Sequence, residues 1–167
     1  DYLFPANSII YLFWPHNRSP NCSLFAVLVY AKNTGIATSR ILRYHIRIMV
    51  KTQEIQVTTE GGCSIVDITD RVARAVTGAQ INSGAVVVFN IGSTAAITTI
   101  EYEPGLVNYD MAEALEKIAP QEGFYEHENT WNDDNGHAHV RASLLGPSLN
   151  VPIVEGKLTL GTWQQIV

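Results

Sequence analysis

The sequence has few cysteines and no long hydrophobic run. Its two cysteines, Cys22 and Cys63, cannot build a disulfide framework, and neither belongs to a Cys-x-x-Cys pair of the kind that binds zinc. No apolar stretch reaches the roughly 18 residues that a membrane span needs; residues 22–31 come nearest and have polar flanks. The chain also opens without the basic start and apolar run of a secretory signal. These absences predict a cytoplasmic protein with no membrane partner and with inert cysteines.

Positive charge and familiar cofactor motifs are also scarce. The chain has 11 Lys and Arg against 16 Asp and Glu, a net charge of −5, so we expect no nucleic-acid partner. It contains no P-loop, no dinucleotide-binding glycine motif and no nucleophilic serine elbow. With 167 residues, 46% of them apolar and 16% charged, it is predicted to form one compact globular domain.

The distribution of charge changes at Met49. Residues 1–48 carry five basic and one acidic residue, whereas residues 49–167 carry six basic and fifteen acidic residues. The first segment has no sustained hydrophobic period and is interrupted by prolines, and the pattern becomes regular after it. Two interpretations remain open. Residues 1–48 are either an extension upstream of a natural start at Met49, or an N-terminal arm that packs on the 49–167 domain or on a partner.

Hydrophobic periodicity and turn residues predict a mixed succession of strands and helices. Ile55 and Val57 point to one side of a half-buried strand, and Asp67 or Thr69 is expected to cap the first helix, which ends at Gly78. Strands mixed with separate helices indicate an α+β fold, a mostly antiparallel sheet with a few helices. The expected elements are a strand at 50–59, a helix at 67–78, a strand buried on both faces at 85–89, a turn and strand at 92–101, a helix capped by Asn108 at 108–120, a loop at 121–135, a short helix at 136–145, and a hairpin of strands 149–154 and 157–160.

Polar and ionisable residues concentrate between His127 and Ser148. Three histidines and two aspartates lie between His127 and His139, which is a composition suited to a metal site. In a helix His137 and His139 would point about 200° apart, so they could not bind the same ion, whereas in a strand they would share a face. The spacing leaves this open, and it also fits histidines and aspartates that are merely hydrogen-bonded in a polar turn.

Four further groups are candidates, each with a plainer alternative. Arg141 and Ser148, with the amides at a helix start, could bind a phosphate or carboxylate, although Arg141 could equally form a surface salt bridge. Ser93 and Thr94 could offer hydroxyl groups to a ligand, or could simply form a turn. Glu101 is either a general base at the rim of a pocket or an exposed strand end. The remaining aromatic candidate, Trp163, is expected in the core rather than in a ligand platform.

Several motifs occur together and in order from about Met49 to the end of the chain. Their residues resemble those of the YjbQ-like family, whose members are also labelled secondary thiamine-phosphate synthases. The motifs are Asp67-Ile-Thr, Ser93-Thr-Ala-Ala-Ile-Thr, Glu101, His127, Asp134-Asn-Gly-His-Ala-His139, Leu145-Gly-Pro-Ser148, Val151-Pro152 and Leu160-Gly-Thr-Trp-Gln-Gln-Ile166.

The resemblance implies a small α+β domain that assembles as a homotrimer, with a histidine-rich pocket that holds a divalent metal, zinc or magnesium, or an anion. It implies a phosphorylated small-molecule substrate and the joining of a hydroxymethylpyrimidine diphosphate to a thiazole phosphate, with release of pyrophosphate. Carried onto this chain, it implies pocket roles for Glu101, His127, Asp134, Asn135, His139 and Ser148. Together with the candidates Arg141, Ser93 and Thr94, we predict catalytic roles for Glu101, His139 and Arg141, substrate-binding roles for Ser93, Thr94, Asn135 and Ser148, and metal-binding roles for His127, Asp134 and His139.

The chain departs from the family pattern in three ways. Gly92 stands where many members have a histidine, which removes one imidazole from the expected pocket. Members usually continue for another strand after the Gly-Thr-Trp-Gln motif, so the resemblance predicts that this chain lacks the final family strand. Residues 1–48 have no counterpart in the family. The Gly92 departure favours the second hypothesis, a non-catalytic trimer that binds a metal or a phosphorylated metabolite.

Overall fold

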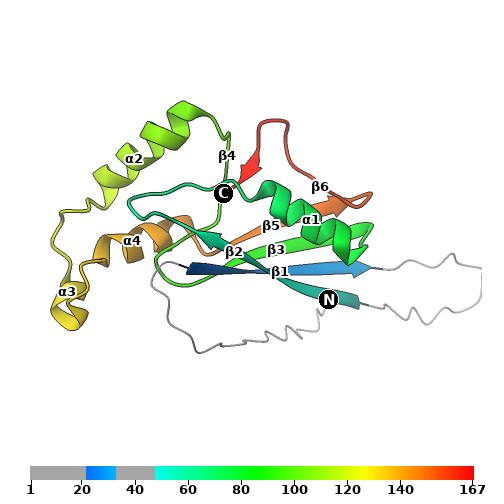
Figure 1. The fold of residues 1–167 in the computed structure, drawn as a ribbon, viewed down its shortest axis with the longest axis horizontal. Coiled ribbons are helices and arrows are strands. Elements are labelled where there is room, and N and C mark those ends of the chain that lie inside the picture. Colours follow the sequence, from blue (N-terminus) through cyan, green and yellow to red (C-terminus); the bar gives the residue numbers. More distant parts are fainter. Residues whose placement is uncertain (1–21, 33–47) are drawn as a thin grey trace, which may run out of the picture.

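The computed structural model describes residues 22–32 and 48–167, and within them the chain forms an α+β fold (Figure 1). The main sheet has five strands in the order β2-β1-β3-β5-β6, and every neighbouring pair is antiparallel. A second, two-stranded sheet pairs β4 with β7. The predicted fold class is therefore confirmed. The strands are β1 Cys22–Lys32, β2 Ile48–Thr58, β3 Ser83–Ile91, β4 Thr99–Ile100, β5 Ser148–Val154, β6 Lys157–Leu158 and β7 Gln165–Ile166.

Strand β1 comes from residues 1–48, the segment whose charge differs from that of the rest of the chain. It lies between β2 and β3, with Ala26 opposite Glu54 on one side and opposite Phe89 on the other. The segment thus contributes a strand to the interior of the sheet. Residues 1–21 and 33–47 lie outside the described residues, and a natural start at Met49 stays a prediction.

Helix α1, Thr69–Ala79, covers one face of the main sheet (Figure 1). The Asp67 carboxylate accepts the Thr69 N–H at 2.8 Å, as the capping prediction required. The helix passes Gly78, its predicted end, and the left-handed residue that follows is Gln80, with φ 56°. The core lies between this helix and the sheet; its largest fully buried members are Ile68, Val72, Val76, Val86, Val88, Ile97, Ile153 and Ile166.

The other face of β3 is more open than its sequence suggested. Val86 and Val88 are completely buried, but Phe89, which points the opposite way, is 39% exposed. The prediction of a strand buried on both faces is therefore wrong for this chain, because α1 covers only one side of the sheet. A continuous apolar run can reflect an exposed apolar face as well as a doubly covered strand.

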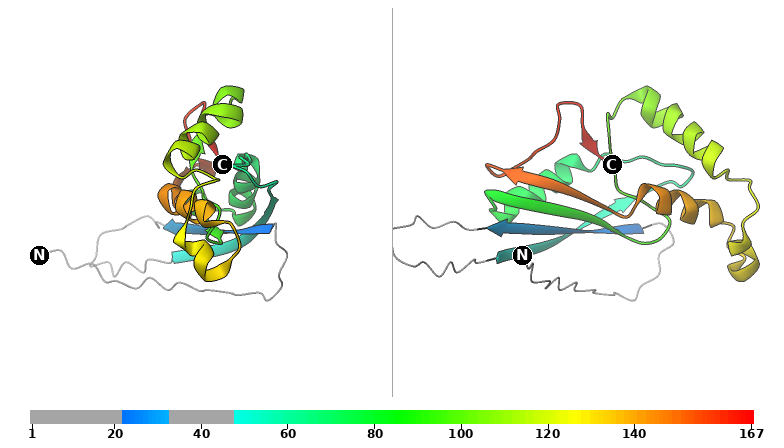
Figure 2. Two further views of the ribbon diagram at one scale, coloured as in Figure 1. Left: turned by 90° about the vertical axis from the view of Figure 1, so that its left-hand side faces the viewer. Right: turned by 180° about the vertical axis from the view of Figure 1, so that it is seen from behind.

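Four helical segments form an arm at one end of the sheet (Figures 1 and 2). They are a π-helical turn at Leu106–Asp110, α2 Met111–Ile118, α3 Glu126–Trp131 and α4 Gly136–Leu145. The predicted short helix at 136–145 is confirmed, whereas α3 lies inside the predicted loop at 121–135. Asn108 does not cap the second helix. The Glu103 carboxylate instead accepts the N–H groups of Gly105 and Leu106, at the start of the π-helical turn that leads into α2.

The C-terminal hairpin forms as predicted, and two neighbouring predictions do not hold. Glu155 and Gly156 join β5 to β6 with φ values of 52° and 74°, the positive pair that a tight two-residue hairpin requires. The strand expected at 92–101 is limited to the two residues of β4. Trp163, expected in the core, is 69% exposed.

Candidate functional site

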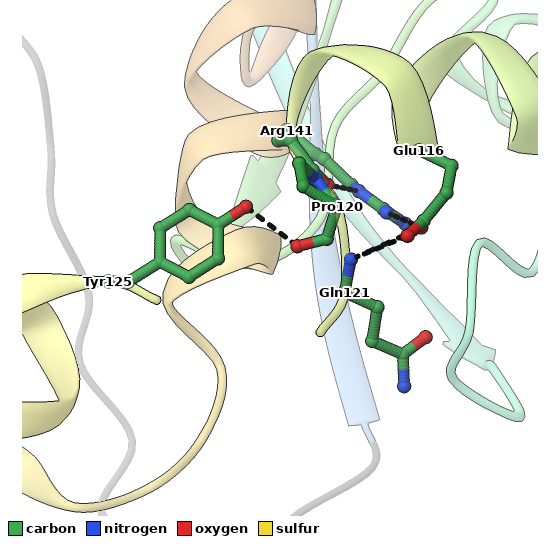
Figure 3. Close-up of polar contacts among 6 residues, drawn as sticks. Glu116, Pro120, Gln121, Tyr125 and Arg141 are labelled. Carbon is green, nitrogen blue, oxygen red and sulfur yellow. Dashed lines mark hydrogen bonds and ion pairs between the residues drawn. The ribbon is translucent and has the colours of Figure 1, made fainter. Parts of the chain in front are cut away.

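Helix α4 begins in close contact with the segment before α3. A β-carbon on Gly136 would lie 2.4 Å from the Tyr125 Cβ and 2.8 Å from its Cγ, so only glycine fits there without displacement. The Tyr125 hydroxyl donates to the Pro120 carbonyl at 2.7 Å, which fixes the ring from its other end (Figure 3). These contacts bring the histidine of α3 to the first turn of α4.

His127 and His139 form an imidazole pair between α3 and α4. Their ring centroids are 4.4 Å apart and the rings are tilted by 51°. The Nε2 atom of His127 lies 3.4 Å from an Asp133 oxygen but is not aligned for a hydrogen bond, and it is buried without a partner. The other Asp133 oxygen accepts the Asn135 amide at 3.1 Å. Two predicted metal ligands are therefore adjacent, beside a carboxylate.

The predicted metal group of His127, Asp134 and His139 does not form as a set. Within residues 22–32 and 48–167, no three His, Cys, Asp or Glu side chains are placed to hold one ion. The carboxylate beside His127 belongs to Asp133, because Asp134 has a left-handed backbone (φ 53°) and the turn directs successive side chains differently. The pair by itself offers two imidazole ligands, so no reaction step is assigned to a metal.

A cavity of about 530 Å³ lies on the other side of α4. It is enclosed by the loops at 59–66 and 91–98 together with parts of α2 and α4. One part of its wall is apolar. The polar and ionisable side chains in the lining are those of Thr59, Glu60, Cys63, Ser64, Thr94, Thr98, Asn135, His137 and Arg141. The apolar part includes Ile65, Val66, Ile91, Ile100, Met111 and Leu115. Three predicted site residues, Thr94, Asn135 and Arg141, therefore share one cavity.

Arg141 connects α4 to α2 as well as lining the cavity. Its Nε donates to the Ala119 carbonyl at 2.8 Å, and one Nη donates to the Glu116 carboxylate (Figure 3). The Arg141 side chain is only 10% exposed. Arg141 thus forms the salt bridge that was one of the two sequence interpretations, although its own guanidinium is buried and only the Glu116 carboxylate is half-exposed. Its catalytic role stays a prediction.

Cys63 introduces an ionisable thiol into the same cavity. Burial raises the pKa of the Cys63 thiol above its ordinary value, and the positive charge of Arg141 opposes that shift without cancelling it. A thiol with a raised pKa is mostly protonated near neutral pH and reacts slowly, because the thiolate is the nucleophile. The predicted inertness fits the surroundings of Cys63, while the side chain of Cys22 lies outside the described residues.

The other predicted site residues lie away from the cavity lining. Glu101, Ser93 and Ser148 are exposed, and His127 and His139 contact each other instead. Their assigned roles stay predictions.

The residue that sequence reasoning left out is His137, which lines the cavity. The signal was present, since a helix at 136–145 already sends His137 and His139 to different faces.

Asn90 holds together two loops that contribute to the site. It is 1% exposed, and its amide donates to the carbonyls of Gly92 and Ala95 at 3.0 and 2.9 Å. Its backbone N–H donates to Pro147 at 2.8 Å. No sequence pattern singled out Asn90, because its side-chain bonds depend on how the loop at 91–98 folds back, and its backbone bond joins segments more than fifty residues apart.

The C-terminal motif at 160–166 serves the scaffold. The Gln164 side chain donates to the Thr99 hydroxyl at 2.9 Å, and the Gln165 side chain accepts the Tyr102 N–H at 2.9 Å. The Ile166 N–H in turn donates to the Thr69 hydroxyl at 2.8 Å. These bonds tie β7 to β4 and to the start of α1, so that part of the shared motif fixes the fold and not the site.

Among the described residues, no helix is both long enough and apolar enough to cross a bilayer. This bears only on helical spans within residues 22–32 and 48–167.

Residues 53–167 match the family model described as UPF0047 protein YjbQ-like. A UPF0047 protein of Archaeoglobus fulgidus is 40% identical over 114 residues, which cover 68% of this chain and 86% of that protein. A UPF0047 protein of Methanothermobacter thermautotrophicus is 38% identical over 117 residues, which cover 70% and 80%.

Solved structures show the same likeness. A YbjQ-like protein of unknown function from Sulfolobus solfataricus P2 matches with a TM-score of 0.61 and 38% identity, over 66% of this chain and 78% of that one. A hypothetical protein from Aeropyrum pernix K1 matches with a TM-score of 0.62 and 34% identity, over 66% and 80%.

Proposed function

Because the chain belongs to the YjbQ-like family of UPF0047 proteins, we propose that its cavity binds a phosphorylated small molecule and that the protein is a thiamine-phosphate synthase-like transferase. The observation that carries the proposal is a cavity of about 530 Å³ that combines an apolar wall with Asn135, His137 and Arg141 at one side. Pockets for small ligands are typically apolar with a few convergent polar groups. An aromatic ring that bears a phosphate matches such a pocket, because it is apolar at one end and charged at the other.

The reaction joins a hydroxymethylpyrimidine diphosphate to a thiazole phosphate. The carbon–oxygen bond to the diphosphate breaks, pyrophosphate leaves with the bonding electrons, and the thiazole nitrogen forms the new bond to that carbon. The leaving group gains negative charge, so cationic and hydrogen-bonding groups near it stabilise the transition state. Arg141 contributes positive charge at the cavity wall, and Asn135 and His137 contribute hydrogen-bonding groups.

A divalent cation at His127 and His139 is a separate part of the proposal. The buried, unpartnered Nε2 of His127 and the adjoining His139 ring support it, and Asp133 adds a nearby carboxylate. When bound, zinc or magnesium would link α3 to α4 on the side of α4 away from the cavity. We expect one zinc or magnesium ion per chain in the purified protein and less than half of that in His139→Ala. Unchanged stoichiometry in that variant would count against this site.

The second candidate is a non-catalytic homotrimer that binds a metal or a phosphorylated metabolite. It is favoured by the position of Glu101, the predicted general base, which is exposed and does not line the cavity. Large apolar side chains on the arm, such as Phe124 and Trp131, are 72% and 69% exposed and would be covered in an assembly. Light scattering on the full chain tests the trimer.

A turnover assay separates the two candidates. The full chain is incubated with the pyrimidine diphosphate and the thiazole phosphate, with and without zinc or magnesium, and thiamine phosphate and pyrophosphate are both measured. We expect equal amounts of the two products and a rate that falls at least tenfold in Asn135→Ala. If the full chain forms no product above the Asn135→Ala background while a phosphorylated ligand still binds, the binding-protein alternative stands.

A further inference from the structure

We propose that His137 is the residue that hydrogen-bonds the anionic end of the ligand in the cavity, in a role distinct from that of His139. The proposal rests on the proposed function, since it names the residue through which that cavity would hold a phosphate. The ligand class is a small molecule with a phosphate or diphosphate at one end and an apolar ring at the other.

The geometry of α4 separates the two histidines. About 200° of helix rotation divides residues that are two positions apart, so the two side chains leave the helix in nearly opposite directions. His139 meets the His127 ring at 4.4 Å, whereas His137 is in the cavity lining and His139 is not. Of the described histidines, His137 is thus the one that a molecule in the cavity can contact.

His137 also has hydrogen-bonding capacity that the protein does not use. Its Nδ1 atom is buried and has no partner, and its nearest aromatic neighbour is Tyr125, with ring centroids 6.4 Å apart. Leaving a buried polar group unpaired costs about 1–3 kcal/mol, so such groups normally find a partner. A ligand in the cavity would supply that partner after the ring turns, because Nδ1 has almost no accessible surface in this orientation.

Two neighbours define what the ligand must offer. Arg141 follows His137 by one helical turn, and two of its donors are occupied by Ala119 and Glu116. It therefore provides positive charge while His137 provides a directed bond. The Oδ1 atom of Asn135 is likewise buried without a partner and can accept a hydrogen bond. The ligand thus carries an anionic group together with at least one hydrogen-bond donor close to it.

The experiment that tests this proposal compares pyrophosphate binding, measured by calorimetry, in the full chain and in four variants. His137→Phe keeps a ring and removes both nitrogens. His137→Asn places an amide near the position of Nδ1, and His137→Gln places one near Nε2. Leu144→Ala, at an exposed position of the same helix outside the cavity lining, is the control. Thermal unfolding of every variant is recorded, so that loss of binding is read only from folded protein.

We expect His137→Phe to weaken pyrophosphate binding at least tenfold and Leu144→Ala to change it less than twofold. One of the two amide variants should recover most of the affinity, which a purely structural role for the ring would not produce. If His137→Phe binds normally, or if Leu144→Ala loses affinity equally, the assignment of His137 is overturned and the proposed function stands. If the unmodified chain does not bind pyrophosphate, the proposed function and this inference both fail. If His137→Phe does not fold, the two amide variants alone test the assignment of His137. Wild-type affinity for pyrophosphate in both would overturn it, whereas loss of that affinity in only one would support it.

Discussion

His137 and His139 are two residues apart on α4, yet one lines a cavity and the other packs against the imidazole of His127. The cavity side joins α4 to α2 through Arg141, and Asn135 lines the same cavity. The paired side joins α4 only to α3 and the turn before it. A single histidine-rich motif therefore supplies two chemically different surfaces. Substitutions at particular residues should therefore disturb one surface or both, and the size of the effect should differ between them.

Gly136→Ala should disturb both surfaces at once. Its new methyl group would overlap Tyr125, and overpacking of this kind costs about 1–3 kcal/mol. Chemical denaturation should show that loss of unfolding free energy, and NMR contacts between the His127 and His139 rings should disappear. Gly78→Ala is the control, since nothing lies within 4 Å of its added carbon and alanine favours a helix by roughly 0.5–1 kcal/mol. Equal stability of the two variants would mean that Tyr125 does not fix the start of α4.

Arg141→Met should disturb only the cavity side. It leaves the buried Ala119 carbonyl without its donor, at a cost of about 1–3 kcal/mol, whereas the half-exposed Glu116 carboxylate still accepts the Gln121 N–H. Denaturation should reveal this loss while the contact of His127 with His139 persists in NMR spectra. Glu113→Gln is the control, because its 4.0 Å pair with Lys117 is exposed and contributes about 0–0.5 kcal/mol. Loss of the imidazole contact in Arg141→Met would show that the two sides are coupled.

Asp133→Asn should affect the paired side alone and by less. The contact between Asp133 and His127 is partly exposed, at 3.4 Å, and ion pairs of this kind contribute roughly 0–1 kcal/mol. The asparagine can still accept the amide of Asn135. We expect a small loss of unfolding free energy and unchanged pyrophosphate affinity. A tenfold change in that affinity would show that the two surfaces form one site.

The smallest effect concerns Cys63. Because its pKa is raised in the folded state, its contribution to stability is complete below the pKa of the unfolded chain and is lost as pH rises through the folded-state pKa. Iodoacetamide should alkylate the folded Cys22→Ser variant with a pH midpoint above that of the same chain in urea. Arg141→Met in that background should move the midpoint still higher, since a lowering charge is removed. A midpoint below the unfolded value would contradict burial as the dominant cause.

Local sequence patterns predicted those elements whose structure depends mainly on residues close together in the chain. Helices at 67–78 and 136–145 were found because caps, glycines and apolar spacing agree, and the hairpin because Glu155 and Gly156 form a tight turn. Helix α3 was missed, since its polar residues show no period and it is stabilised by packing against α4. The end of the predicted 92–101 strand is set by pairing with β7, which no local pattern reveals.

The candidate site was predicted by region more accurately than by residue. Thr94, Asn135 and Arg141 do share a cavity, and His127 and His139 do meet. Glu101 and Ser148 are exposed outside it, and Asp133 takes the place expected of Asp134. Positions within a turn depend on backbone angles such as the φ of 53° at Asp134, which one sequence does not fix.

By itself the sequence determined the α+β class, the family, the helical state of residues 136–145 and the absence of a long hydrophobic run. Those properties depend on composition, on periodicity and on residues close together in the chain. Only the tertiary structure decided that β1 lies inside the sheet, that Arg141 is held by Glu116 and Ala119, and that His137 and His139 serve different surfaces. Each of these depends on which distant segment packs against a given face, and that choice is made by the whole core at once.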